Sequence, residues 1–226
     1  MSPEPRDTSL PAPPPLPVPE DLVARLATIG VTLDAGMIAK IADFLARMLA
    51  VNERMNLTAI TEPDAVWSRH ALDACTLLPG LTAVPAGARL LDLGSGGGVP
   101  GIIVAITRPD LRVTLVESTQ KKAAFLAAVA DALGLTNVQV VAERAEKLGP
   151  DHLQQDVVTA RAVARLTELI PWTAPLARSG GRLLFIKGER ANEELQEAHR
   201  VLNRFGVRHV RTVVTPTGRV MVFKKG

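Results

Sequence analysis

Glycines crowd one short stretch of the chain, Leu90-Leu91-Asp92-Leu93-Gly94-Ser95-Gly96-Gly97-Gly98-Val99-Pro100-Gly101. An apolar run leads into them, and a helix is expected to begin near Pro100. Glycine lets the backbone turn sharply and approach a ligand with no Cβ in the way. The unpaired amides at the start of a helix carry a partial positive charge. The stretch therefore predicts a loop that binds a carboxylate or a phosphate.

Two classes of ligand fit this loop. Gly96, Gly98 and Gly101 have the spacing of the dinucleotide fingerprint, which would suit an NAD-dependent oxidoreductase. The pattern Asp92-x-Gly94-x-Gly96-x-Gly98 instead resembles the first motif of class I S-adenosylmethionine-dependent methyltransferases. We favour the second, because its first glycine directly follows the expected strand, whereas a fingerprint that starts at Gly96 begins later.

A second candidate binding residue is Glu117, which ends the apolar run Val113-Thr114-Leu115-Val116. A carboxylate at the tip of the second strand can accept both ribose hydroxyls of a nucleoside. The alternative is that Glu117 caps a helix that starts near Thr119.

The elements around these residues alternate between short apolar runs and amphipathic segments. Strands are expected at 90–93, 113–117, 138–141, 157–160 and 183–186, and helices at 100–107, 119–134, 165–178 and 192–204. This alternation predicts a parallel sheet with helices on both faces. Strands at 206–214 and 219–225 flank a short connection, which indicates a final antiparallel hairpin. The fold class is therefore a Rossmann-like α/β protein with a seven-stranded, mostly parallel sheet.

The first 80 residues differ in texture from the rest. Eight prolines in 1–19 predict an extended, mobile tail, with a docking peptide as its alternative function. Helices are expected at 20–29, from the N-cap Asp34 onward, and at 63–78. The expected organisation is a tail at 1–19, a helical cap at 20–80 and a binding core at 81–226.

The composition narrows the class of protein further. Cys75 is the only cysteine, which excludes an intramolecular disulfide and suits a reducing compartment. The sequence shows neither a membrane span nor a signal peptide, so we expect a cytoplasmic protein, and we expect a monomer without a metal site. The net charge of +3 permits a nucleic-acid partner without requiring one.

An ordered set of further motifs resembles one family, the bacterial small-subunit ribosomal RNA guanine-N7 methyltransferases (the RsmG or GidB family). Besides the glycine loop, the matching stretches are Asn56-Leu57-Thr58, Arg69-His70-Ala71-Leu72-Asp73, Glu117-Ser118, Lys121-Lys122, Arg144-Ala145-Glu146, Ala160-Arg161-Ala162 and Lys187-Gly188. The Pro-rich tail is not part of the pattern. Glu117 stands where an aspartate is common, and Lys121-Lys122 replaces a Lys-Arg pair.

This resemblance implies methyl transfer from S-adenosylmethionine to N7 of a guanine in 16S ribosomal RNA, guanine-527 of the 530 loop, within the small ribosomal subunit. The alternative is a class I methyltransferase that acts on a small molecule or a protein. The resemblance implies a cofactor site formed by the following residues: Gly94, Gly96, Gly98, Val99, Glu117, Ala145, Glu146 and Arg161.

Cations near the expected strand ends are candidates to hold the RNA. Arg161 and Lys187 follow the fourth and fifth strands, and we expect them to position the reactants, because guanine N7 carries no proton and needs no general base. Phosphate contacts are expected from the following residues: Arg69, His70, Lys121, Lys122, Arg144, Arg165 and Lys187. For any one of them a solvated surface charge is the alternative, and for His70 the alternative is a hydrogen bond to Asp73.

Overall fold

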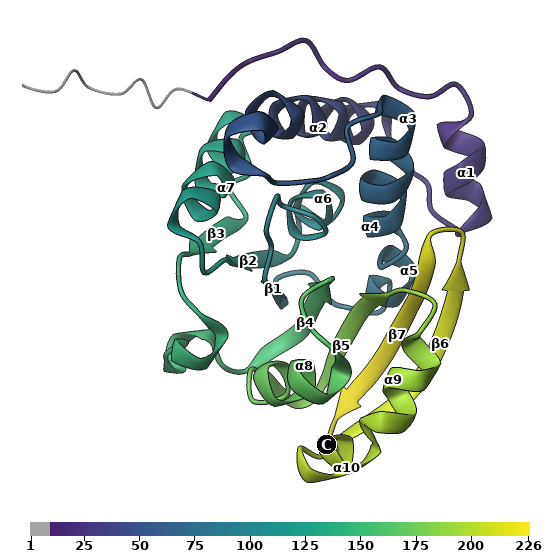
Figure 1. The fold of residues 1–226 in the computed structure, drawn as a ribbon, viewed down its shortest axis with the longest axis vertical. Helices are drawn as coiled ribbons and strands as arrows, with labels where there is room; N and C mark the ends of the chain where they lie inside the picture. The colour runs from purple at the N-terminus through teal and green to yellow at the C-terminus, as the bar shows by residue number, and fades with distance from the viewer. Residues whose placement is uncertain (1–9) are drawn as a thin grey trace, which may run out of the picture.

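The computed structural model describes residues 10–226, so 1–9 of the expected tail lie outside the described residues. Seven strands form one sheet in the order β3-β2-β1-β4-β5-β7-β6 (Figure 1). Their bounds are β1 Arg89–Leu93, β2 Arg112–Val116, β3 Val138–Val141, β4 Gln155–Arg161, β5 Ala177–Lys187, β6 Val207–Thr215 and β7 Gly218–Lys225. The first five strands pair in parallel, and β7 pairs antiparallel with both β5 and β6. The predicted sheet and its terminal hairpin are confirmed.

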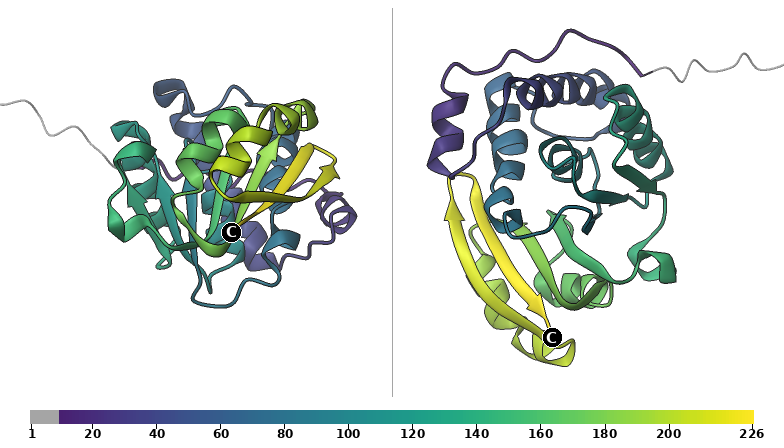
Figure 2. Two further views of the ribbon diagram at one scale, coloured as in Figure 1. Left: turned by 90° about the horizontal axis from the view of Figure 1, so that it is seen from below. Right: turned by 180° about the vertical axis from the view of Figure 1, so that it is seen from behind.

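Helices cover both faces of the sheet, as Figures 1 and 2 show. One layer and the N-terminal cap hold α1 Leu22–Thr28, α2 Ala35–Met55, α3 Pro63–Val66, the π-helical segment η1 Trp67–Leu72, α4 Asp73–Cys75, α5 Leu78–Leu81, α6 Gly101–Thr107 and α7 Gln120–Ala132. The other layer holds α8 Leu166–Thr173, α9 Ala191–Glu197 and α10 His199–Arg204. Two short 3-10 turns, η2 Ala145–Lys147 and η3 Pro150–His152, follow β3. Two apolar clusters, one per face, fill the spaces between these layers. Among the helices of residues 10–226, none is both long and apolar enough to cross a bilayer.

The cap helices follow the sequence signals closely. The Asp34 carboxylate accepts a hydrogen bond from the Met37 amide at 2.8 Å, so it is the predicted N-cap of α2. The expected helix at 63–78 is observed as α3, η1 and α4 in unbroken succession. Some boundaries differ from the expected ones. The helix expected at 63–78 ends at Cys75, and the one expected at 165–178 ends at Thr173, with β5 already beginning at Ala177. The helix expected at 192–204 is divided into α9 and α10.

The described part of the expected mobile tail, residues 10–19, is extended but held against the cap. The Leu16 side chain is buried at 9% exposure, and its amide donates to the Ala42 carbonyl at 3.1 Å. The buried Trp67 indole donates to the Pro17 carbonyl at 2.7 Å. Figure 1 shows this segment running along α2 before α1 begins. Proline has a carbonyl acceptor but no backbone N–H, so the cap can bind this segment by donating hydrogen bonds to its carbonyls.

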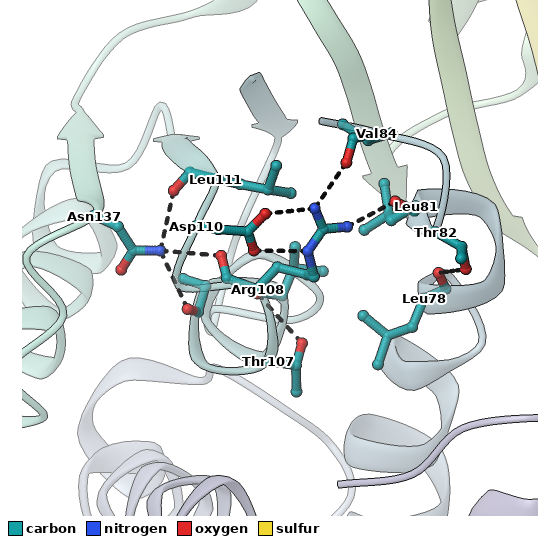
Figure 3. A network of polar contacts seen from close by, with 11 residues as sticks. Leu78, Leu81, Thr82, Val84, Thr107, Arg108, Asp110, Leu111 and Asn137 are labelled. Carbon is teal, nitrogen blue, oxygen red and sulfur yellow. Dashed lines mark hydrogen bonds and ion pairs between the residues drawn. The ribbon is translucent and has the colours of Figure 1, made fainter. Parts of the chain in front are cut away.

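Polar contacts fix the loops at the amino ends of the parallel strands (Figure 3). The Arg108 guanidinium donates to the carbonyls of Leu81 at 2.6 Å and Val84 at 2.9 Å, and pairs with Asp110 at 2.7 Å. The Asn137 amide donates to three carbonyls, that of Ala105 in α6 and those of Arg108 and Leu111 between α6 and β2, at 3.2–3.4 Å. These groups satisfy backbone acceptors at element ends, so this part of the edge is structural.

Candidate active site

The glycine loop lies at the carboxyl end of β1 and has the backbone that only glycine adopts readily. Gly94 and Gly96 have φ values of +70° and +55°. A Cβ at Gly94 would lie 2.8 Å from Cγ2 of Val163, whereas one at Gly96 would lie 3.8 Å from the Gly94 carbonyl oxygen, an ordinary van der Waals contact. The loop is therefore packed from one side at Gly94 and open at Gly96, where a ligand can approach the backbone.

A buried carboxylate, that of Asp92, fixes the glycine loop. Asp92 is fully buried; its carboxylate accepts from the Thr159 hydroxyl at 2.8 Å and from the Gly101 amide at 3.2 Å. Burial raises the pKa of Asp92 to about 6, although the hydrogen bonds oppose this shift. Asp92 thus ties the end of β1 to the start of α6 and is not free to bind a ligand.

Glu117 caps the start of α7, which is one of the two roles that the sequence allowed for it. Its carboxylate accepts from the Thr119 amide at 2.7 Å, at the start of α7, and from the Gly96 amide at 2.9 Å. Each carboxylate oxygen has a second lone pair, so the group can still accept hydroxyls of a ribose. The contact with Gly96 was not expected from the sequence, and it fixes the open part of the glycine loop.

A cavity of about 250 Å³ opens beside Gly94 at the carboxyl ends of β1, β2 and β3. It is lined by Leu93, Gly94, Val116, Ser118, Glu143, Arg144, Ala145, Glu146, Val163 and Trp172. Of the predicted cofactor residues it brings together Gly94, Ala145 and Glu146. The cavity is slightly smaller than pockets that enclose a whole drug-sized ligand. It therefore suits one part of a nucleoside ligand, and the glycine loop beside it is available for another part.

The other predicted cofactor residues lie elsewhere. The Val99 side chain is buried at 8% exposure in the apolar core, and Gly98 is buried against Phe44 and Ile102. Arg161 does not line the cavity. Two residues that line the cavity were not predicted from the sequence: Val163, which follows β4, and Trp172 of α8. Trp172 lies inside α8, where its helical spacing does not distinguish it from a core residue.

Arg161 lies in a network that joins β4, the helical segment of η1 and α4, and the β6–β7 turn. Its guanidinium donates to the Asp73 carboxylate at 2.6 Å and to the Arg69 carbonyl at 2.6 Å. The other Asp73 oxygen accepts from the Thr217 hydroxyl at 2.5 Å. Because Asp73 is buried, this pair is shielded from water, and breaking it would leave an uncompensated charge. The predicted free cation is thus committed to its own chain.

His70 belongs to the same network but does not bond Asp73 directly. Its Nδ1 lies 3.4 Å from the Arg161 guanidinium, and its Nε2 lies 2.8 Å from the Thr58 hydroxyl. Burial, with the nearby Arg161 charge, lowers the pKa of His70 to about 4. His70 is therefore neutral at pH 7. The expectation that it holds a phosphate as a cation does not fit this environment.

Lys187 is also turned inward. Its ammonium group donates to the Ala164 carbonyl at 2.6 Å and pairs with Glu194 at 2.7 Å, and its side chain is 8% exposed. The Glu194 carboxylate also accepts from the Leu166 amide at 3.1 Å. The structure therefore places Lys187 as a link between β5, α8 and α9, and its predicted phosphate contact is not available in this arrangement.

The remaining predicted RNA ligands are mostly exposed. Arg69, Lys121 and Arg144 are exposed and Lys122 is half-buried. Arg144 borders the cavity. Arg165 pairs with Glu197 at 2.9 Å, with about half of each side chain exposed. An exposed pair of this kind is weak and can exchange for another anion.

Comparisons with known proteins identify the class of site. Residues 37–221 match the family model described as GidB, rRNA small subunit methyltransferase G. The chain belongs to the GidB family. The rRNA small subunit methyltransferase G of Sorangium cellulosum (strain So ce56) is 60% identical to it over 218 residues, which cover 96% of this chain and 91% of the relative. That of Roseiflexus castenholzii (strain DSM 13941 / HLO8) is 45% identical over 82% of this chain and 80% of the relative.

Solved structures confirm the fold of this GidB-family chain. A SAM dependent methyltransferase from Aquifex aeolicus superposes with a TM-score of 0.57, covering 75% of this chain and 96% of that chain at 18% identity. The predicted family, fold class and cofactor are confirmed, and the cofactor is S-adenosylmethionine. The family assignment also decides between the two interpretations of the glycine loop in favour of the methyltransferase motif. The site fits this cofactor, because Gly94 and Gly96 leave its backbone open and Glu117 keeps acceptors for hydroxyls.

Proposed function

We propose that this protein transfers a methyl group from S-adenosylmethionine to N7 of a guanine in the 16S RNA of the small ribosomal subunit, in the cytoplasm and as a monomer. The relatives named rRNA small subunit methyltransferase G support the substrate class. The observation that carries the proposal is the open glycine loop between the Glu117 carboxylate and the cavity at Ala145 and Glu146.

Each part of this site suits one part of the cofactor. The cavity between Gly94, Ala145 and Trp172 offers an apolar slot with Glu146 at its rim, which suits an adenine. Glu117 would accept the ribose hydroxyls, and the amides of the glycine loop would face the carboxylate of the amino-acid end. In this assignment Val99 and Gly98 shape the loop from the core and do not touch the cofactor through side chains.

The reaction asks little acid–base chemistry of the protein. When bound, S-adenosylmethionine supplies an electrophilic methyl group on a sulfonium. Guanine N7 is a neutral acceptor with an exposed lone pair, so no proton must leave before attack. The chain's contribution is therefore positioning, which can be worth up to about 7–11 kcal/mol. The neutral His70 and the internally paired Arg161 agree with this, because neither brings an unpaired positive charge toward a cationic cofactor.

Arg161 and Lys187 act in this proposal as positioning residues. Arg161 fixes the end of β4 to the Arg69–Asp73 segment, and Lys187 fixes the end of β5 to α8. Arg69, Lys121, Lys122, Arg144 and Arg165 remain candidates to contact phosphates beside the cavity.

The decisive experiment incubates the purified protein with S-adenosylmethionine and unmethylated small subunits. We expect one methyl group per subunit, mapped by strand cleavage specific for N7-methylguanine. Gly96→Val, which fills the open side of the loop, should lose the activity. Methyl transfer to protein or to metabolites, with unmodified rRNA, would refute the proposal.

A further inference from the structure

Positive charge is distributed very unevenly along this chain. Residues 198–226 contain seven of its 26 Lys and Arg residues and none of its 23 Asp and Glu residues, so the rest of the chain has four more acidic than basic groups. The last acidic residue is Glu197. This terminal stretch forms α10 and the β6–β7 hairpin, which Figure 1 shows at the edge of the molecule, with β6 outermost.

Three cations stand directly beside one another across the last strands of the sheet. Arg182 of β5 is opposite Lys224 of β7, and Lys224 is opposite Arg208 of β6. Directly opposed like charges destabilise a sheet, typically by a few tenths to 1 kcal/mol per pair. Within residues 10–226 none of the three forms an ion pair. The fold thus holds a cation row whose repulsion its own acids do not relieve.

The cation row faces a groove between the hairpin and α5. The groove has a volume of about 400 Å³ and is lined by Pro79, Gly80, Thr82, Ala83, Gly180, Arg182, Arg208, Val210, Arg211, Val222, Phe223 and Lys224. Its lining has a fourth cation, Arg211, and no acidic residue. The Arg182 guanidinium donates once to the Gly80 carbonyl at 2.8 Å, which leaves its other N–H groups for a ligand.

Arg208 and Lys224 also border a second hollow on the side of α10. That hollow, of about 760 Å³, adds His199, His209 and Lys225 to the lining and again has no acidic residue. The Lys225 ammonium donates to the Phe205 carbonyl at 2.9 Å, so it is held in place beside the hollow. Arg208 and Lys224 line both hollows, so the cation row contributes basic groups to each of them.

The cation row lies away from the cofactor site. Lys224 pairs with Arg182, five residues before Lys187 at the carboxyl end of β5. At about 3.3 Å per residue, the cation row is ~17 Å from the edge at which the cofactor binds. A group bound in the groove cannot be the methylated guanine, so the groove must serve another part of a large anionic partner.

We propose that the groove around Arg182, Arg208, Arg211 and Lys224 is a second RNA contact, which binds the sugar–phosphate backbone of the substrate rRNA outside the target nucleotide. This rests on the proposed function, which supplies an RNA partner. Phosphates match a row of unpaired cations in charge, and Arg presents a planar fork that fits them. Such contacts fix the register of the protein on the RNA without reading bases.

The test is a double variant, Arg208→Gln with Lys224→Gln, and its control, Lys40→Gln with Arg112→Gln, which removes the same charge from exposed positions outside the groove. Binding of wild type and both variants is measured on small subunits and on protein-free 16S rRNA over a range of KCl concentrations. For the double variant we expect binding at least about tenfold weaker, and a log–log salt slope lower by about 1.4–1.8 for two phosphate contacts. The control should follow the wild type, and affinity for S-adenosylhomocysteine should be equal in all three.

The outcomes separate the two proposals. If the wild type methylates rRNA and the double variant binds both RNAs as the control does, the groove proposal is wrong and the proposed function stands. A further outcome is that the double variant loses affinity only for subunits, while protein-free rRNA binds all three proteins equally or binds none of them. That result would assign the groove to a ribosomal protein and overturn the RNA contact. A wild type that neither binds nor methylates rRNA would overturn both.

Discussion

Two sets of cations in the sheet, the residues Arg161 and Lys187 and the cation row, differ in how their charge is balanced. At the carboxyl end Arg161 and Lys187 each have a carboxylate of their own chain, Asp73 and Glu194. Arg182 of the cation row lies in the middle of β5, level with Leu90 near the start of β1. Within residues 10–226 the cation row has no acidic partner, and it faces a groove. A cation at a strand end is therefore not by itself a ligand contact. Such a cation is available to a ligand only when no carboxylate of its own chain is paired with it.

The chemistry of the two ligands explains this difference. The carboxyl end receives a cofactor with a positive sulfonium, beside which an unpaired cation would be repelled. Backbone amides and the Glu117 carboxylate bind such a ligand without adding positive charge. An RNA backbone is an array of anions, for which unpaired Arg and Lys side chains are the suitable contacts.

The largest effect is expected when the buried pair at the carboxyl end is broken. Arg161→Met leaves Asp73 buried without its cation, so we expect a loss of about 3–5 kcal/mol in the free energy of unfolding, measured by urea denaturation. A second change, Asp73→Asn, should restore part of this loss. Arg178→Met breaks an ion pair of similar length, 2.7 Å to Asp156, with 47% of the arginine side chain exposed, and should cost at most about 1 kcal/mol. Equal losses in the two single variants would mean that Arg161 is a surface charge.

The neutral state of His70 should appear in the pH dependence of stability. Its pKa is about 4 in the folded protein and 6.5 ordinarily, so the unfolded chain takes up the proton first as the pH falls. The stabilisation is complete above pH 6.5 and is lost as the pH falls toward 4. Over that range His70→Gln should remove up to about 3 kcal/mol of the wild-type loss.

The measurement is a series of urea titrations between pH 4 and 7.5, with His199→Gln on the exposed surface of α10 as the matched control. If wild type and His70→Gln have parallel curves, the pKa of His70 is the same in the folded and the unfolded chain, and the folded protein gains this proton below about pH 6.5. The carboxyl end would then carry an additional positive charge, against the comparison drawn above.

Cofactor binding at the carboxyl end should depend on the open backbone of the glycine loop. Gly96→Val puts a side chain where a Cβ meets only the Gly94 carbonyl oxygen, at 3.8 Å, so we expect the dissociation constant for S-adenosylhomocysteine to rise at least about 100-fold, or ~2.7 kcal/mol. Gly134→Val is the matched control, because Gly134 also has a positive φ, +63°, and open space around it, but lies at the end of α7. Both variants should lose stability through backbone strain, and only Gly96→Val should lose affinity in calorimetry.

The sequence predicted most of the fold because its signals are local. Parallel strands are buried on both faces, and they appear as apolar runs such as 113–116. The glycine loop was visible for the same reason. The end of α8 could not be predicted, because the apolar residues around Pro175 and the start of β5 fit a helix as well as a strand. Residues 10–19 were misjudged because their contacts, such as that of Pro17 with Trp67, span 50 positions.

The sequence shows the motif positions of the candidate site but not the contacts of its charged side chains. Gly94, Ala145 and Glu146 were predicted from motif positions, and the fold brings them to one cavity. The inward orientation of Arg161 and Lys187 depends on Asp73, 88 positions away, and on Glu194 in another helix, which no local pattern shows. The cation row was missed because Arg182, Arg208 and Lys224 come from three strands and meet only through pairing register.

The smallest effect should have the opposite sign from the others. Lys224 stands between Arg182 and Arg208, so Lys224→Gln removes two like-charge contacts at once. We expect the free energy of unfolding to rise by about 0.2–1 kcal/mol at low salt, and the gain to shrink as salt screens the repulsion. Lys40→Gln, on the exposed surface of α2, should leave stability within about 0.5 kcal/mol of wild type. A loss of stability in Lys224→Gln would mean that the charge of this lysine is balanced within the fold, as that of Lys187 is. The cation row would then no longer differ from Arg161 and Lys187. A gain would show that the folded protein tolerates the repulsion within the cation row.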